Sequence, residues 1–300
     1  MDTNNTIDVD NERGRYTSEL LEPKSIVATL EIMCTMAVCK WRNPIGFFWQ
    51  SISGGAMVMF GVMLAVSVGA GIPYPGWANL ASGFVFGFSF VIIMVSNSSL
   101  ITSDMAAGFI ALWRKKMSLQ GYIGYLLLGW VGNVIGAFIF IGIIAVGPGD
   151  YAMPVFLMRA HMIGLSKVIP SGLSVFCMGI ICTWLLQLGY FLYIKSRTDV
   201  GKMVMAWYGP LAFVGGMTEH CIANIGFIGL PLLMQNRYIA ALHNNSTIKP
   251  EHIVNITWGF GHYGLARNEL ISWCGNWVGG TLFIAILFMA IAKYYKKDTI

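Results

Sequence analysis

The chain has 300 residues, of which 56% are apolar and 11% are charged, and its mean hydropathy is +0.65. A soluble protein would carry roughly twice that share of charged residues, so the composition excludes an ordinary soluble fold and predicts an all-α polytopic membrane protein. The six cysteines show no metal or disulfide spacing, and we expect no metal, no cofactor and no nucleic-acid partner.

The N-terminal segment, residues 1–45, is expected to be cytoplasmic and to contain one amphipathic helix. Its first 24 residues are polar and acidic, so no cleavable signal peptide is expected. Apolar residues recur at helical spacing across 23–42, and Pro44 should end the helix. A brace on the membrane surface is the simplest interpretation of this pattern.

Long runs without charge mark the membrane spans. The runs are 43–103, which holds two helices with a break at 69–76, and then 117–149, 168–194, 203–236 and 270–292. Each is near or above the ~20 residues that cross the hydrocarbon core. We therefore expect six transmembrane helices within residues 46–293, followed by a cytoplasmic tail, 294–300.

Lysine and arginine concentrate on one side of these spans. They are Lys40, Arg42, Arg114, Lys115, Lys116, Lys195, Arg197, Lys202, Lys293, Lys296 and Lys297. Because positively charged loops stay in the cytoplasm, both termini are expected there. In the opposite loops Asn244, Asn245 and Asn255 match the N-glycosylation pattern, which chance also explains.

An internal repeat relates the two halves of the chain. GWVGNVIGAFIF (129–140) in the third span and SWCGNWVGGTLF (272–283) in the sixth share the core Gly-Asn-x-x-Gly. The glycines permit close helix packing, and Asn133 and Asn276 then lie at mid-membrane. Since three spans is an odd number, the two three-helix repeats must insert with opposite orientation.

Polar residues interrupt the second and fifth spans. SNSSLITSDM (96–105) contains Asp104, which we expect to cap the following half-helix, and MTEHCIANIGF (217–227) contains Glu219 and His220. A mid-membrane carboxylate costs about 2.5 kcal/mol or more, so it is expected to face a protein-lined path. Broken helices at equivalent places in inverted repeats indicate a transport site, and polar kinks used only for packing are the alternative.

Three motifs together resemble the formate/nitrite transporter family. FVGGMTEHCIAN (213–224) is similar to the family's fifth-span pattern, SLITS (99–103) resembles the loop of its broken second span, and both Gly-Asn-x-x-Gly segments match. The resemblance covers most of residues 23–295. It implies a homopentamer of aquaporin-like channels in the cell membrane, with lipid, small anions and protons as partners.

The resemblance also implies roles for individual residues. The substrate pathway is expected to use His220, the Thr102 that faces it, Lys167, Glu219, Asn224 and Ser103. Constrictions are expected at Phe86 and Phe213 on the cytoplasmic side, and at Phe90, Leu100 and Ile101 along the central cavity and the outer constriction. Asn133, Asn276 and Thr183 are expected to form a polar packing core.

Four positions depart from the family pattern. Relatives usually carry an acid where this chain has Ser99, an aromatic residue at Ile101, an uncharged residue at Asp104 and an asparagine at Thr183. The exchange at Ile101 favours acids larger than formate. These departures leave gating and substrate preference open.

The expected function is passage of a small weak-acid anion, such as formate, acetate, lactate, nitrite or hydrosulfide, together with a proton. Desolvation raises the pKa of an anion that moves inward, and histidine is the side chain suited to relay a proton. Lys167 would attract anions from outside, unless it is only an interfacial lysine that snorkels. Whether His220 itself donates the proton stays open.

Other functions fit the residues less well. An aquaporin-type channel for neutral solutes would have similar architecture, but the Asn-Pro-Ala motifs of aquaporins are absent from both breaks. An intramembrane enzyme is not expected, because neither a Gly-x-Ser-Gly segment nor an HExxH motif occurs. The paired broken helices argue against a receptor or scaffold.

Overall fold

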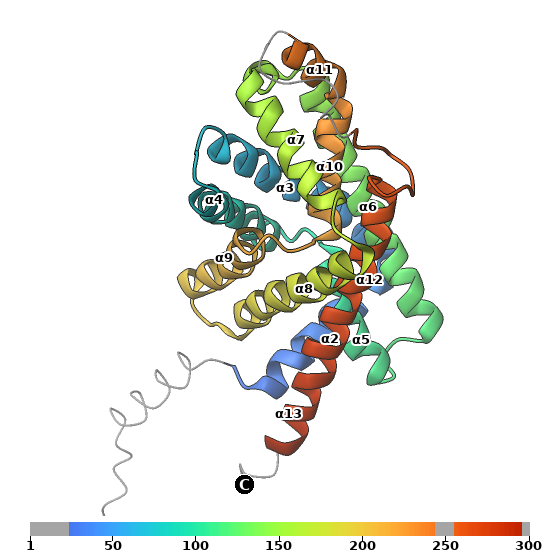
Figure 1. The fold of residues 1–300 in the computed structure, drawn as a ribbon. Helices are drawn as coiled ribbons and strands as arrows, with labels where there is room; N and C mark the ends of the chain where they lie inside the picture. Colours follow the sequence, from blue (N-terminus) through green and yellow to red (C-terminus); the bar gives the residue numbers. More distant parts are fainter. Residues whose placement is uncertain (1–23, 244–254, 296–300) are drawn as a thin grey trace, which may run out of the picture.

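The computed structural model describes residues 24–243 and 255–295 (Figure 1). This part of the chain is helical, and its β-structure is limited to one isolated bridge between Thr257 and Gly264. The predicted all-α fold is therefore confirmed. The segment before residue 24, Asn244, Asn245 and the end of the tail lie outside the described residues.

The described part of the first half, from residue 24 on, contains five helices. They are α2 (Ile26–Arg42), α3 (Pro44–Gly69), α4 (Pro75–Val95), α5 (Ile101–Trp113) and α6 (Leu119–Val146). The predicted break at 69–76 lies between α3 and α4, and α4 and α5 are the two parts of the broken second span.

The second half repeats this order. It contains η1 (Gly149–Ala152), α7 (Pro154–Val168), α8 (Gly172–Lys195), α9 (Asp199–Gly215), α10 (Cys221–Leu233), α11 (Gln235–His243), α12 (Leu265–Gly280), the π-helix η3 (Thr281–Ile286) and α13 (Leu287–Tyr295). The broken fifth span comprises α9 and α10, and α11 leaves α10 at 56°. The sequence did not predict α7 as a separate helix.

Polar side chains start several of the long helices. The amide three residues along donates to the side chain of each N-cap residue: Asn43, Ser118, Ser171 and Thr198. These caps replace bonds that the first turn of a helix cannot make within itself. Among the described residues, α3, α4, α6, α8 and the continuous run α12–α13 are long and apolar enough to span a membrane.

The N-terminal helix α2 packs into the body of the protein. Leu30, Met33 and Ala37 are fully buried, and the helix contacts α3, α5, α8 and α13. These three residues belong to the apolar face that the sequence predicts. The apolar face of α2 therefore packs against other helices of the protein. That this helix also braces the protein at the membrane surface stays a prediction.

The two halves share a fourth element that the sequence repeat did not reveal. A short helix with a lysine in its last turn precedes the first long span of each half: α2 with Lys40 before α3, and α7 with Lys167 before α8. In turn α2 contacts α5, and α7 contacts α10. Figure 1 shows α2, α5 and α13 gathered at one end and α7, α10 and α11 at the other, named here the α2 end and the α7 end.

Candidate functional site

Two asparagines hold the breaks in the broken helices. Asn133 of α6 accepts from the Ile101 amide at 2.8 Å and donates to the Ser99 carbonyl at 2.8 Å. Asn276 of α12 accepts from the Cys221 amide at 2.9 Å and donates to the Glu219 carbonyl at 2.8 Å. Both amides thereby satisfy backbone groups that the breaks leave without helical partners.

The glycines beside these asparagines allow the close approach. A Cβ at Gly136 would lie 1.9 Å from the Ile52 carbonyl oxygen, and one at Gly279 would lie 2.4 Å from that of Ile180. Any larger residue would push α6 from α3, or α12 from α8. The Gly-Asn-x-x-Gly segments therefore serve packing and loop support together.

The matching bonds align the breaks residue by residue. Because Ser99 corresponds to Glu219 and Ile101 to Cys221, Leu100 occupies the position of His220. The site is thus asymmetric at its centre. One break contributes an apolar side chain and the other an imidazole.

The His220 ring contacts both halves of the protein. It caps α10, because its Nδ1 accepts from the Ala223 amide at 3.1 Å. In the neutral ring the hydrogen then belongs to Nε2, which lies 2.9 Å from Thr102 Oγ1. The structure therefore brings the central histidine and the loop threonine into direct contact, with the Thr102 hydroxyl hydrogen free for another acceptor.

Gln187 of α8, which the sequence did not single out, supports Thr102. Its Nε2 donates to the carbonyls of Thr102, at 2.5 Å, and Ser103, at 3.0 Å. The hydroxyls of Ser103 and Thr183 are buried without a hydrogen-bond partner. Ser103 and Thr183 therefore pack in the core without side-chain hydrogen bonds. The polar contacts from α8 to this part of α5 come from Gln187, one helical turn after Thr183.

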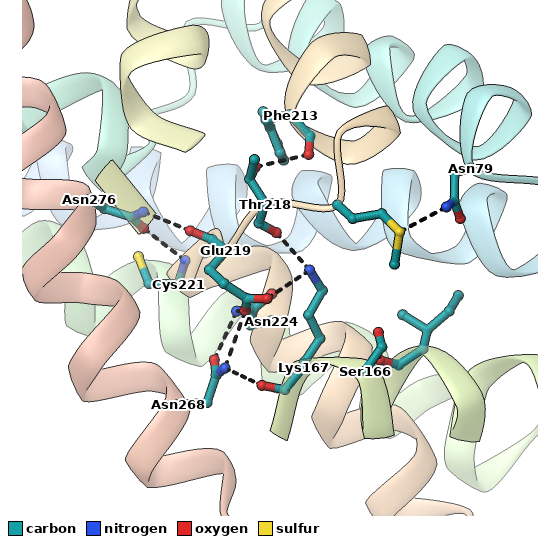
Figure 2. Close-up of polar contacts among 12 residues, drawn as sticks. Asn79, Ser166, Lys167, Phe213, Thr218, Glu219, Cys221, Asn224, Asn268 and Asn276 are labelled. Atoms are coloured by element: carbon teal, nitrogen blue, oxygen red, sulfur yellow. Dashed lines mark hydrogen bonds and ion pairs between the residues drawn. The ribbon is translucent and has the colours of Figure 1, made fainter. Parts of the chain in front are cut away.

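Figure 2 shows a charge cluster around Glu219, the residue that directly precedes His220 in the chain. Lys167 Nζ lies 3.2 Å from Glu219 Oε1 and donates to the Thr218 carbonyl at 2.6 Å. The other carboxylate oxygen accepts from Asn224 at 2.6 Å and Asn268 at 3.2 Å. Lys167 is therefore no interfacial lysine, because its ammonium group is buried against a carboxylate.

A second buried charge cluster occupies the matching place in the first half. Lys40 Nζ lies 2.7 Å from Asp104 Oδ1 and 2.8 Å from Ser99 Oγ, and the Ser99 hydroxyl donates to Asp104 Oδ2. Asp104 lies in the first turn of α5, but its side chain bonds to Lys40 and Ser99 and does not cap the helix. The expected cap is therefore wrong.

A cavity of about 430 Å³ leads from the α7 end to His220. Its wall comes from α7, the loop between α3 and α4, the end of α9 and the start of α10, and includes Arg159, Lys167, Thr218 and Asn224. Most other lining side chains are apolar, among them Met158, Met162, Ile163 and Phe227. It is large enough to admit a small organic acid.

Phe213 lines this cavity beside His220. Its ring stacks on His220, with centroids 5.1 Å apart, and meets Phe86 edge-on at 5.6 Å. Phe213 lines the same cavity as Lys167, so the expected placement of this pair on the cytoplasmic side, opposite Lys167, is wrong. The cause is the loop after α9, which folds back so that the Thr218 amide and hydroxyl both donate to the Phe213 carbonyl.

The other expected constriction residues lie deeper. Phe90, Leu100 and Ile101 are fully buried and do not line the cavity at the α7 end. The Ile101 side chain lies against Gly129 of α6. Among the described residues, no group of three or more His, Cys, Asp or Glu side chains is arranged to hold a metal ion.

Known proteins with related sequences are transporters. The nitrite transporter NirC of Escherichia coli is 27% identical over 63% of this chain and 69% of its own length. A probable formate transporter of Methanothermobacter thermautotrophicus is 27% identical over 88% of this chain and 96% of its own.

Two solved structures share the fold. An FNT family ion channel superposes with a TM-score of 0.75 at 22% identity, covering 88% of this chain and 99% of its own. A pentameric formate channel with formate bound superposes with a TM-score of 0.71 at 20% identity, covering 84% of this chain and 98% of its own. The family model for formate/nitrite transporters matches residues 27–290. This integral membrane protein therefore belongs to the formate/nitrite transporter family.

Proposed function

We propose that the protein is a channel for small weak-acid anions, which cross its centre between Thr102 and His220 together with a proton. The observation that carries this proposal is the 2.9 Å contact between these two side chains, of which His220 lines the cavity. A hydroxyl and an imidazole so placed offer a substrate carboxylate one hydrogen-bond donor and one proton carrier.

The apolar groups around His220 favour proton coupling. A bare anion that left water for the space between Phe213, Phe86 and the buried centre would lose its hydration shell. Burial raises the pKa of a carboxylic acid, so protonation there removes the charge that makes the crossing costly. Transfer of the neutral acid equals symport of the anion with one proton.

The charge cluster around Glu219 positions this centre. The Glu219 carboxylate accepts from Asn224 and Asn268, and its backbone carbonyl accepts from Asn276. His220 is the next residue in the chain, so these bonds fix the backbone from which its ring extends. In this proposal Glu219, Asn224 and Lys167 hold the loop, and His220 and Thr102 contact the substrate.

Flux measurements in liposomes test the proposal. We expect formate, acetate, lactate, nitrite or hydrosulfide to enter faster at lower external pH, because the proton is a co-substrate, while water permeability matches that of empty liposomes. Fast water or glycerol flux without acid uptake would instead identify the aquaporin-type alternative. Each anion is tested separately, since the physiological one is not fixed by these residues.

A further inference from the structure

Arg159 is a second cation in the cavity and lies two helical turns before Lys167 on α7. Both side chains line the cavity, with Ile163 between them on the same face of the helix. The spacing 159, 163, 167 places them in one row. An anion that enters from the α7 end therefore passes two positive side chains before it meets His220.

The two cations differ in whether a carboxylate lies beside them. Lys167 is bound to the Glu219 carboxylate and the Thr218 carbonyl. Arg159 Nε is buried without a hydrogen-bond partner, and the cavity lining contains no Asp or Glu. Among the described residues that line the cavity, Arg159 is thus the cation without a carboxylate.

The surroundings of Arg159 indicate which kind of ligand it would bind. Its guanidinium lies over Gly69, where an added Cβ would come within 2.9 Å of both Nε and Nη2. Met158, Met162 and Ile72 are among the apolar residues that line the same cavity. A planar guanidinium pairs with a carboxylate through two parallel hydrogen bonds, and the apolar wall suits a short hydrocarbon tail.

We propose that Arg159 forms a recruiting subsite for monocarboxylates with a short apolar substituent, such as lactate, ahead of the central His220–Thr102 site. This inference rests on the proposed function. In this proposal Arg159 attracts the incoming anions, and Lys167 does not, because Glu219 neutralises the charge of Lys167. Formate lacks the tail and should gain less from the subsite than lactate.

Concentration-dependent lactate uptake into liposomes tests this role. In Arg159→Gln we expect the half-saturating lactate concentration to rise about tenfold or more, with the maximal rate retained, because the central site is intact. Arg159→Lys keeps the charge but lacks the forked guanidinium, so its half-saturating lactate concentration should lie between those of the wild type and Arg159→Gln. The matched control is Arg237→Gln, which removes the same charge from an exposed position outside the cavity and should change nothing.

Binding measured without transport separates this subsite from the proposed function. In a His220→Phe background we expect lactate still to raise the Tm of the purified protein, and Arg159→Gln to abolish that rise. Without lactate, Arg159→Gln should unfold no earlier than its parent, because the guanidinium leaves no partner behind. An unchanged half-saturation, or a lactate-induced Tm rise that survives Arg159→Gln, would overturn the subsite. Failure of every acid to enter the wild-type liposomes would overturn the transport function instead.

Discussion

The two ring nitrogens of His220 have different partners, and this difference defines its proposed role. Nδ1 accepts from the Ala223 amide, so the hydrogen of the neutral ring points from Nε2 to Thr102. A proton gained at Nδ1 must displace the amide bond there, and the resulting imidazolium can then release its Nε2 hydrogen toward the substrate position. We therefore expect exchange with substrate at Nε2.

Substitution of His220 should separate conduction from proton coupling. His220→Phe removes the central titratable group and should abolish lactate and formate uptake. His220→Asn keeps a polar side chain without a titratable proton and should conduct with a flattened dependence on external pH. Uptake in liposomes between pH 5 and 8 measures both effects, and size-exclusion chromatography checks assembly. Wild-type uptake with an unchanged pH profile in His220→Phe would exclude the histidine as the centre.

Lys167 and Glu219 should behave as a structural pair. Lys167→Ala leaves the Glu219 carboxylate buried without its cation and should destabilise the protein by about 3–5 kcal/mol. The double variant Lys167→Met with Glu219→Gln removes both charges and should recover most of that loss. Thermal unfolding in detergent measures the recovery. Equal stability of the single variant and the wild type would show that the ammonium group makes no net contribution.

At the level of the helices, the two half-structures share one arrangement of residues but carry the carboxylate at different positions. In each half a lysine in the last turn of a short helix lies beside the break residue and its partner five positions later. Lys167 pairs with Glu219, which accepts from Asn224. Lys40 contacts both Ser99 and Asp104. In the second half the carboxylate is at the break, and in the first half it is five residues on. Compared with the second half, Ser99 and Asp104 have exchanged roles, because the carboxylate is at the later position and pairs with the lysine of the preceding short helix.

This exchange predicts a rescue. Asp104→Asn alone leaves Lys40 without a carboxylate and should lower the Tm by several degrees, as expected for loss of a buried pair. Adding Ser99→Asp copies the arrangement of the second half and should restore most of the Tm. Asp199→Asn, an exposed acid in an i,i+3 pair with Lys202, is the matched control with little expected effect. If Ser99→Asp fails to rescue, the two positions are not equivalent.

The spans and breaks were predictable because their signals are local. Charge-free runs predicted the membrane helices, and repeated Gly-Asn-x-x-Gly segments predicted the helices that support the breaks. Helix α7 escaped prediction because its 15 residues include Arg159, His161 and Lys167, which hide its apolar face. The Lys40–Asp104 pair joins residues 64 positions apart, and the fold-back after α9 depends on bonds to the Phe213 carbonyl, so neither leaves a pattern in the sequence.

At the scale of the whole protein, α6 exposes a long apolar stripe. On α6 every fourth residue is an exposed aliphatic side chain: Ile123, Leu127, Val131, Ile135, Ile139 and Ile143. A stripe of this length would be unstable in water, so lipid or a neighbouring subunit must cover it. The homopentamer that the sequence motifs imply, with one pore in each protomer, would cover part of this stripe, and one of the matching folds is that of a pentameric channel.

Orientation and assembly can be tested together on the intact protein. Lysine and arginine gather at the ends of spans on the α2 side, so we expect both termini in the cytoplasm, as the charge bias of membrane loops predicts. Tags at the two ends should label only after the membrane is made permeable, whereas a tag inserted at residues 245–250 should label in intact cells. Native mass spectrometry should give five copies of the 33.0 kDa chain. Labelling of the terminal tags in intact cells would show the opposite orientation. The cavity, Thr102 and His220 all lie within one protomer. A stable monomer that still transports would therefore show that transport does not require the pentamer.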